Sequence, residues 1–571
     1  MRTKTLSILI LLINTAIIGA KAQDFSSLKP QKPVALYGSI GAGLNFYSSN
    51  QQYKTQDPFA WNIYGNLTPS LYGIALPFSF VITQYSKSYT SPFTQFGISP
   101  SYKWIRLHLG YRNISFSPFT FDGQSFLGAG IELTPGKFYL GAFYGRLNKA
   151  INEDTAFNRN IQPQYGRKGY GVKLGYGSSN ENISFQFFHA QDDTASIKRY
   201  HDSLTTILPM ENTVIGSSWH FMFFKRLTLT GDLAISLLNR DMYYQRIDSI
   251  GYVKVPSLVQ SINPINYSST VSYSGQAQLV LVLNSFNASA GYRRIAPDFL
   301  SLGVPYMLND VEMISASAAA SLFKGKLSLN AAANSQHNNL EHMLSSSLQT
   351  RTGNFGLNAF LSQHANLNIS ITGVNVFQKD GLLHLTDSVK MNQVMWNAAL
   401  SPVFTFSNSY HQQTISISAN YTDLNDKNPA TTAQASTQSF SSSASYALFF
   451  SQAYWGINGS LVYTQYKQQN NVYRSAGLNA GASVQMLKQH NLMTQASAGY
   501  FVNSSANGTV ANNTTFSFNS SYSLQKHSFG FYLSYILTPP VNLNPLNVVN
   551  HIPIAVNSKN LSGGLTYACR L

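Results

Sequence analysis

Apolar residues and small polar residues alternate along most of this chain, in runs of about ten residues. In one such run, Phe516 and Phe518 alternate with Ser517 and Asn519, and the pattern continues to residue 525. Because successive side chains of a β-strand point to opposite faces, each run predicts a strand with one apolar and one polar face. Many such strands in one chain are typical of a barrel with lipid outside and water inside.

The connections between these runs are of two kinds, short turns and long polar loops. Short turns are expected at 134–137, 225–226, 284–285, 324–325, 364–365, 489–490 and 526–527. Longer connections are expected at about 150–166, 192–211, 240–266, 296–311, 339–350, 378–391, 424–436 and 538–558. Short periplasmic turns and long extracellular loops are typical of outer-membrane barrels.

These patterns predict an all-β fold: a single transmembrane, antiparallel, up-and-down β-barrel of about 26 strands, within a range of about 22 to 28. The first strand is expected near 34–48 and the last at 559–571, where Leu561, Leu565 and Leu571 share one face. A soluble β-sandwich also alternates, but a chain this long would divide into domains. A solenoid would need a fixed repeat, and the sequence shows none.

The N-terminus has the pattern of an export signal. Arg2 and Lys4 precede an apolar stretch at 6–18, and Ala20-Lys21-Ala22 has the small residues of a cleavage site. We therefore expect residues 1–22 to be a signal peptide, 23–33 a short periplasmic segment and 34–571 the barrel. Residues 23–33 are too few to form a plug domain.

Charge and cysteine content narrow the function classes. Charged residues make up only 11% of the chain, which suits a surface in lipid. The formal charge is +16, but the cations lie at turns and strand ends and do not form one stripe, so no nucleic-acid partner is expected. Cys569 is the single cysteine, which excludes an intrachain disulfide and a cysteine-based metal site.

If the apolar faces point outward, the other faces line the lumen. The lumen-facing charges expected in the first half are Arg106, Arg112, Glu132, Lys173, Asp232 and Arg293. The second half carries mainly Ser, Asn, Thr and Gln on that face, so a hydrated lumen is favoured over a selectivity ring of one sign. A barrel of this size would be roughly 50 Å across. We therefore expect inward-folded loops, a kidney-shaped cross-section or a partner protein to fill the lumen.

Two loop regions carry candidate polar clusters. The first cluster brackets the segment 296–305 and includes Arg293. Its inward-loop candidates are Arg294, Asp298, Asp310 and Glu312. This segment is expected to be ordered and packed inward, with an ordinary external loop as the alternative. The second cluster, His189, Asp192 and Asp193, could hold a hard cation or simply begin a solvated loop.

No catalytic motif stands out. The sequence contains no nucleophile elbow, Walker loop, zinc motif or EF-hand pattern. We therefore expect no enzyme activity, no cofactor and no metal site, and Gly-rich runs such as 169–171 are assigned to strands.

The signal ending in Ala-Lys-Ala-Gln, the aromatic-rich and acid-poor strands, and the Asn/Gln/Ser-rich loops resemble those of large outer-membrane barrels of the Bacteroidota. The resemblance identifies no family of known activity. Segments 123–145 and 292–312 share this resemblance. It implies O-glycosylation at Asp-Ser/Thr-apolar triplets. The candidate acceptors are Thr155, Thr194, Ser203, Ser249 and Ser388.

Three functions fit these patterns. The first is a transport or export pore in the cell outer membrane, gated or filled by inward loops or a partner. The second is a surface scaffold that anchors an adhesin or another exported protein, and the third is a hydrolase at the outer rim. Outer-membrane lipid and lipopolysaccharide are expected partners, together with a periplasmic or surface protein that acts as plug or cargo.

Overall fold

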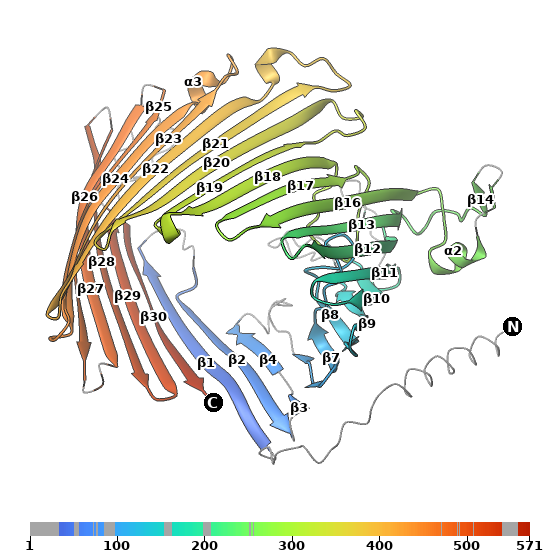
Figure 1. Ribbon diagram of the computed structural model, residues 1–571, viewed down its shortest axis with the longest axis horizontal. Coiled ribbons are helices and arrows are strands. Elements are labelled where there is room, and N and C mark those ends of the chain that lie inside the picture. Colours follow the sequence, from blue (N-terminus) through green and yellow to red (C-terminus); the bar gives the residue numbers. More distant parts are fainter. Residues whose placement is uncertain are drawn as a thin grey trace.

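The strands form one closed ring in the computed structural model (Figure 1). The structure describes residues 34–50, 56–71, 74–75, 78–84, 97–152, 163–197, 207–250, 253–254, 256–469, 471–487, 489, 491–505, 508–538 and 558–571. The expected signal peptide and the segment 23–33 lie outside the described residues, so the boundaries at 22 and 33 stay predictions.

The first half of the ring begins with long strands and continues through several short ones. Its strands are β1 (Val34–Ser49), β2 (Phe59–Leu71), β3 (Ile74–Ala75), β4 (Phe78–Thr83), β5 (Gly97–Ile98), β6 (Ser101–Tyr102), β7 (Ile105–Arg112), β8 (Phe126–Leu133), β9 (Phe138–Asn148), β10 (Gly166–Gly177), β11 (Glu181–Asp193), β12 (Glu211–Phe223), β13 (Leu227–Asn239), β16 (Ser269–Val282) and β17 (Phe286–Ile295).

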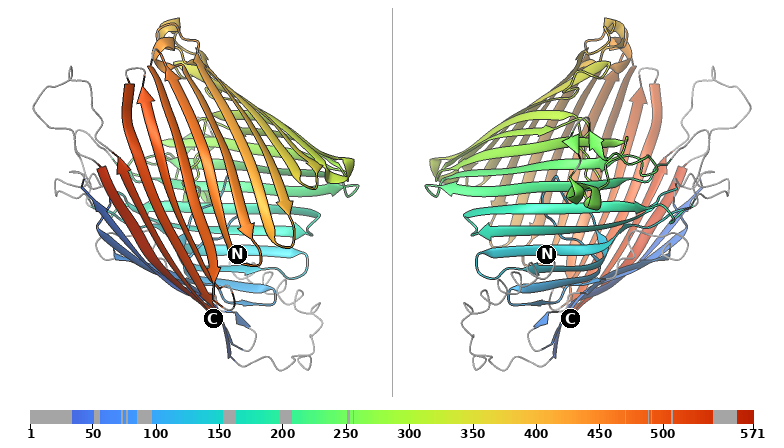
Figure 2. Two further views of the ribbon diagram at one scale, coloured as in Figure 1. Left: turned by 90° about the vertical axis from the view of Figure 1, so that its left-hand side faces the viewer. Right: turned by 90° about the vertical axis from the view of Figure 1, so that its right-hand side faces the viewer.

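The second half consists of longer, more uniform strands. They are β18 (Val311–Leu322), β19 (Leu327–His337), β20 (Ser346–Ser362), β21 (Ala365–Asp380), β22 (Asn392–Ser407), β23 (His411–Asp426), β24 (Thr437–Phe450), β25 (Trp455–Gln468), β26 (Asn471–Met486), β27 (Leu492–Ser505), β28 (Gly508–Leu524), β29 (His527–Thr538) and β30 (Ser558–Arg570). Figure 2 shows these strands side by side in chain order.

The helices and one small hairpin lie in the connections. They are α2 (Ser257–Ile262), α3 (Thr432–Ala435), the short 3₁₀ turns η3 (Phe323–Gly325) and η4 (Asp387–Val389), and the hairpin of β14 (Ser249–Ile250) and β15 (Val253–Lys254). None of the helices in the described ranges is long and apolar enough to cross a bilayer.

The described strands make a 26-strand antiparallel barrel, as predicted from the alternation. The sheet contains 28 strand segments, but β3 and β4 both pair with β2, and β5 and β6 both pair with β7, so each pair is one interrupted strand. Pro100 lies between β5 and β6 and has no N–H to donate to a ladder. The ring closes where β1 pairs with β30, from Ser39↔Arg570 to Ser49↔Asn560.

The two kinds of connection lie at opposite ends of the barrel. The strand ends that flank all seven short turns expected from the sequence lie at one end of the barrel, and those that flank the predicted long loops lie at the other. The turn between β12 and β13 places Lys225 at φ 57°, and that between β18 and β19 places Lys324 at φ 58°. Two connections at the loop end, β25 to β26 and β27 to β28, are also short.

The two faces of the wall differ in chemistry. On one face, large apolar side chains have no covering layer; examples are Phe185, Ile215 and Trp396, which are 60%, 59% and 55% exposed. On the opposite face the same strands carry glycine, hydroxyl, amide and charged residues, together with buried apolar residues in one part of the ring. An uncovered apolar face is stable in lipid and a polar face is stable in water, so the apolar face is the outer one.

The buried core lies on the inner face of one part of the ring. Fourteen buried apolar residues form one cluster, which draws on β8, β9, β11, β12, β13, β17 and two connections, 113–125 and 296–310. We call 113–125 the first inner segment and 296–310 the second inner segment. We call β7–β13 with β16 and β17 the lined arc, and β18–β30 the plain arc. Both inner segments pack on the lined arc.

Candidate functional site: the charged inner wall

The lined arc carries all six charges that the sequence analysis assigns to the lumen. Residue alternation places Arg106, Arg112, Glu132, Lys173, Asp232 and Arg293 on the same face of the wall as the buried cluster. The cross-strand register aligns Arg106 with Glu132, Lys173 with Gln186, and Gln276 with Arg293. Positive and negative charges therefore alternate around this part of the inner wall.

Glu132 is the centre of the first group of contacts. Its carboxylate lies 2.9 Å from His108 Nε2, accepts a hydrogen bond of 2.8 Å from the Tyr139 hydroxyl, and forms an ion pair of 3.5 Å with Arg106. Ser99 contacts the other ring nitrogen of His108 at 3.0 Å. These three contacts around one carboxylate fix the position of Glu132 on the wall.

Lys173 and Asp232 have partners of two different kinds, an inner segment and the wall itself. Lys173 Nζ donates a 2.5 Å hydrogen bond to the carbonyl oxygen of Phe116, in the first inner segment. Asp232 accepts hydrogen bonds from Ser218 at 2.5 Å and from Gln276 at 2.8 Å. The lysine therefore fastens the inner segment, while the aspartate is held by neutral donors of the wall itself.

Arg293 and Arg112 are the remaining two of the six lumen-facing charged residues. The guanidinium carbon of Arg293 lies 5.4 Å from the centroid of the Phe119 ring, a cation–π contact with the first inner segment. Arg112 donates a hydrogen bond to the carbonyl oxygen of Gly97, across the interrupted strand. Both arginines therefore stabilise local structure, and Arg293 does so by contacting an inner segment.

The two inner segments pack on each other and on the wall through aromatic rings. The Phe121 ring lies 4.3 Å from that of Phe143 and 5.4 Å from that of Phe188, and Phe119 makes an edge contact of 6.1 Å with Phe299. Phe119, Phe121, Phe188 and Phe299 are all fully buried. Burying a side chain of this size contributes about 1.5–3 kcal/mol, so the inner segments are firmly anchored.

Backbone groups of the inner segments are paired as well. Ser301 donates to the Thr120 carbonyl at 2.6 Å, and Asn212 of β12 accepts from the Leu302 amide at 3.0 Å. Ser236 of β13 donates to the Leu300 carbonyl at 2.6 Å. These bonds compensate for the water that the buried backbone loses.

The second inner segment is thus packed inward through its apolar side chains, and the four charged candidates make contacts outside the buried cluster. Arg294 and Glu312 form an ion pair of 2.5 Å on the outer face of β17 and β18. Asp298 pairs with Arg240 at 2.8 Å and is exposed. Asp310 accepts from the Asn339 and Leu340 amides at 2.8 and 2.9 Å, and so fixes the neighbouring loop.

The first inner segment escapes prediction from sequence. Its residues Phe119 and Phe121 are two positions apart, as on one face of a short strand, and they are buried in a cluster with Phe299 and Leu302, far along the chain. The local signal is one proline and one glycine: Pro118 and Gly123 interrupt the alternation, and Gly123 has φ 69°.

The cluster His189, Asp192 and Asp193 does not converge on one point. Arg167 occupies the Asp192 carboxylate with bonds of 2.7 and 3.0 Å. His189 lies on the opposite face, 2.9 Å from the Thr213 hydroxyl. The described residues contain no group of three or more acidic, His or Cys side chains placed to hold a metal ion.

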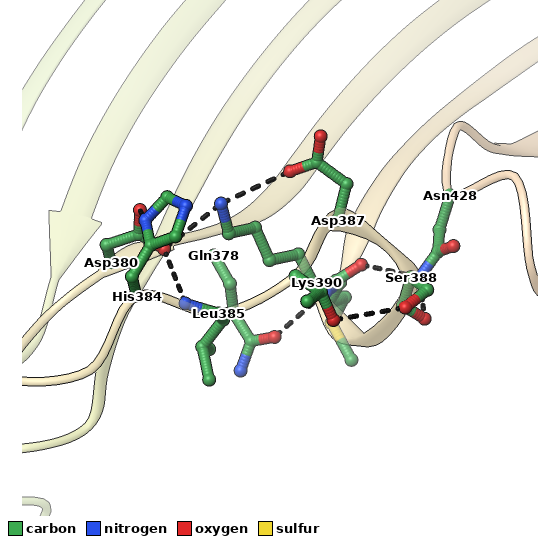
Figure 3. A network of polar contacts seen from close by, with 10 residues as sticks. Gln378, Asp380, His384, Leu385, Asp387, Ser388, Lys390 and Asn428 are labelled. Atoms are coloured by element: carbon green, nitrogen blue, oxygen red, sulfur yellow. Dashed lines mark hydrogen bonds and ion pairs between the residues drawn. The ribbon is translucent and has the colours of Figure 1, made fainter.

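The described glycosylation candidates lie at the loop end. Thr194 and Ser249 are exposed, and Ser388 lies exposed in η4. Figure 3 shows the contacts around Ser388: its carbonyl accepts from Asn428 at 3.0 Å, and the nearby Lys390 pairs with Asp380 and Asp387. These contacts raise the pKa of Lys390, first through its hydrogen bond to Asp380. Thr155 and Ser203 lie outside the described residues.

These features define the chain as a transmembrane β-barrel with a polar, partly lined lumen. No family model matches the sequence, and no curated protein matches it. Among solved structures it is similar to the copper transporter OprC, with 8% identity over 95% of this chain and 81% of that one, at a TM-score of 0.40.

Two further similar structures have comparable scores. A mutant of the ferric enterobactin receptor PfeA of Pseudomonas aeruginosa shares 9% identity over 93% of this chain and 80% of its own, at a TM-score of 0.39. OccAB2 of Acinetobacter baumannii shares 10% over 68% of this chain and 97% of its own, at 0.30. Superpositions this loose carry no argument about function, and the barrel rests on its own strand pairings.

Proposed function

We propose that this chain is an outer-membrane transport or export pore. Its lumen is partly filled by the two inner segments, and a periplasmic or surface partner completes the closure. The observation that carries the proposal is a closed ring with an apolar outer face and a polar inner face, on which the charges of the lined arc are gathered. Such a wall suits the passage of hydrated solutes or polypeptide.

Ion current through the purified protein in planar bilayers tests the pore. We expect discrete steps from the wild type. Ser418→Trp points a large side chain to the lumen, whereas Ile417→Trp points one to lipid, because neighbouring strand residues face opposite ways. The step should fall in Ser418→Trp and stay unchanged in Ile417→Trp. A folded wild type without steps, or equal steps in both variants, would contradict the proposal.

Export also has a direct test. If residues 1–22 are a cleaved signal, the protein isolated from the outer-membrane fraction begins at Gln23. Recovery of the uncleaved chain, or of the protein in the soluble fraction, contradicts this part of the proposal.

A surface scaffold is the second candidate, because the loop end exposes apolar side chains. Tyr306 and Leu308 of the second inner segment are 96% and 80% exposed, and Met343 in the next loop is 70% exposed. A single exposed apolar residue is common on protein surfaces. Exposed apolar residues on neighbouring loops can together form a surface for contact with another protein. The scaffold would be favoured if a surface protein co-purified with the wild type and not with the double variant Tyr306→Ser/Leu308→Ser. Neither the wild type nor the variant would then conduct ions.

A further inference from the structure

Two cations on the outer face of the plain arc share one aromatic ring. The Arg351 guanidinium carbon lies 5.2 Å from the centroid of the Phe377 ring, and Lys379 Nζ lies 5.7 Å from the same centroid. Alternation puts all three side chains on the lipid-facing side of β20 and β21, with Arg351 opposite Asn375. They lie near the strand ends that lead into the long loops.

These two cations differ from Arg294, which lies on the outer face at the same end of the barrel. Arg294 is neutralised by Glu312 at 2.5 Å. Of the ion pairs among the described residues, none within 4.0 Å involves Arg351 or Lys379, and both residues are exposed. A cation on a lipid-facing surface is costly without a counter-charge, so an anion from the surroundings is the natural partner.

An apolar groove begins directly below the cations. It has a volume of about 410 Å³, and Arg351 forms its polar end. Its floor includes Gly353 and Gly373, which lie opposite each other, and its walls include Phe355 and Trp396. A Cβ added at Gly353 would meet no atom within 4 Å, so the groove is open over this residue.

The combination of two cations and an apolar groove fits an anionic amphiphile. The short turns at the other end of the barrel place the loop end outside the cell, so this groove faces the outer leaflet. We propose that it binds a phosphorylated glycolipid of that leaflet, with the phosphate held by Arg351 and Lys379 and one acyl chain in the groove. Charge-assisted hydrogen bonds from the two cations to the phosphate and burial of the acyl chain in the groove both stabilise the bound lipid.

Lipid retention by the detergent-purified, full-length barrel tests the site, with lipid A as the probe and native mass spectrometry as the measurement. The wild type should retain one lipid A molecule. Arg351→Gln/Lys379→Gln should lower retention about tenfold at equal lipid concentration, since it removes the phosphate contacts. Gly353→Leu, which fills the groove without changing charge, should lower it by a similar factor.

Matched controls separate this site from general attraction to anions. Lys324→Gln/Lys326→Gln removes the same charge at the turn end and should leave retention unchanged. Dephosphorylated lipid A and phosphatidylglycerol should each be retained about tenfold less well than lipid A. Equal retention by wild type and the Arg351/Lys379 variant, or equal retention of phosphatidylglycerol, overturns the proposal. None of these measurements depends on conductance, so the result is independent of the pore.

Discussion

The lined arc and the plain arc are built from the same alternating strands, yet they differ in thickness. In the lined arc the wall is covered by two inner segments, and every large buried side chain of the cluster lies there. In the plain arc, Ala359 is the one buried apolar side chain of the described residues. Its inner face instead carries hydroxyl pairs such as Ser418 with Ser443 at 2.7 Å.

This difference shows on which part of the lumenal face the barrel can carry charged side chains. Charged side chains of the lined arc form hydrogen bonds or other contacts with the wall or with the inner segments. Lys173, for example, donates a hydrogen bond to the Phe116 carbonyl oxygen. Between its strand ends, the inner face of the plain arc has neutral side chains, and some of them bond to cross-strand neighbours, as Ser418 does to Ser443. One side of the lumen is therefore a fixed electrostatic surface, and the other is a hydrated neutral one.

The largest expected effect removes the aromatic centre of the lined arc. Phe121→Ala should destabilise the barrel by about 3–5 kcal/mol, because Phe121 is fully buried against Phe143 and Phe188. The midpoint of urea unfolding in detergent, followed by the gel shift of the folded barrel, measures this. A midpoint equal to that of wild type would show that the inner segments do not support the wall.

A glycine comparison sharpens the contrast in packing. A Cβ at Gly303 would lie 2.6 Å from the Thr120 carbonyl, whereas one at Gly353 in the plain arc would meet nothing within 4 Å. Gly303→Ala should therefore cost about 1–3 kcal/mol through overpacking, and Gly353→Ala should cost almost nothing. The same unfolding experiment compares the two variants, and equal midpoints would contradict the difference in packing.

Two substitutions, one in each arc, test the electrostatic difference between the lined arc and the plain arc. Asp232→Asn leaves Lys173 and Arg293 in place, so the permeability ratio of chloride to potassium should rise by about twofold. Asn420→Asp adds an acid to the inner face of the plain arc and should move the ratio the other way. Reversal potentials in a KCl gradient measure both. Shifts of the same sign would show that these residues do not face the ion path.

The smallest effect belongs to a hydroxyl pair of the plain arc. Ser418→Ala removes the bond to Ser443, which is open to lumenal water, and should cost about 0.5–1 kcal/mol. Urea unfolding under the conditions used for Phe121→Ala provides the comparison. A loss as large as that of Phe121→Ala would mean that the plain arc is no less tightly coupled than the lined one.

Much of the fold could be predicted because barrel strands carry a local signal. Alternation in runs such as 516–525 assigns the two faces, and turn residues such as Pro135 and Gly136 mark the strand ends. The expected count of about 26 strands is confirmed. The interruptions within 74–83 and 97–102 were less visible, because strands there are short and their pairing depends on distant neighbours.

The site was less accessible from sequence than the fold. Charged residues such as Lys173 and Asp232 stand out among neutral neighbours, so the sequence identifies them as candidates. Their partners do not stand out, because Phe116 and Gln276 are ordinary residues whose roles arise from tertiary contacts. For the second inner segment, the sequence drew attention to its charges, whereas buried Phe299 and Leu302 anchor it.

The pairing of β1 with β30 has a consequence for how this molecule is assembled. Residues at the seam, such as Tyr47 and Asn560, are 513 positions apart in the chain. Until they meet, the growing sheet has two bare edges able to recruit strands from other molecules. Closure of so distant a contact is slow, so biogenesis requires that both edges be shielded from aggregation until the last strand arrives.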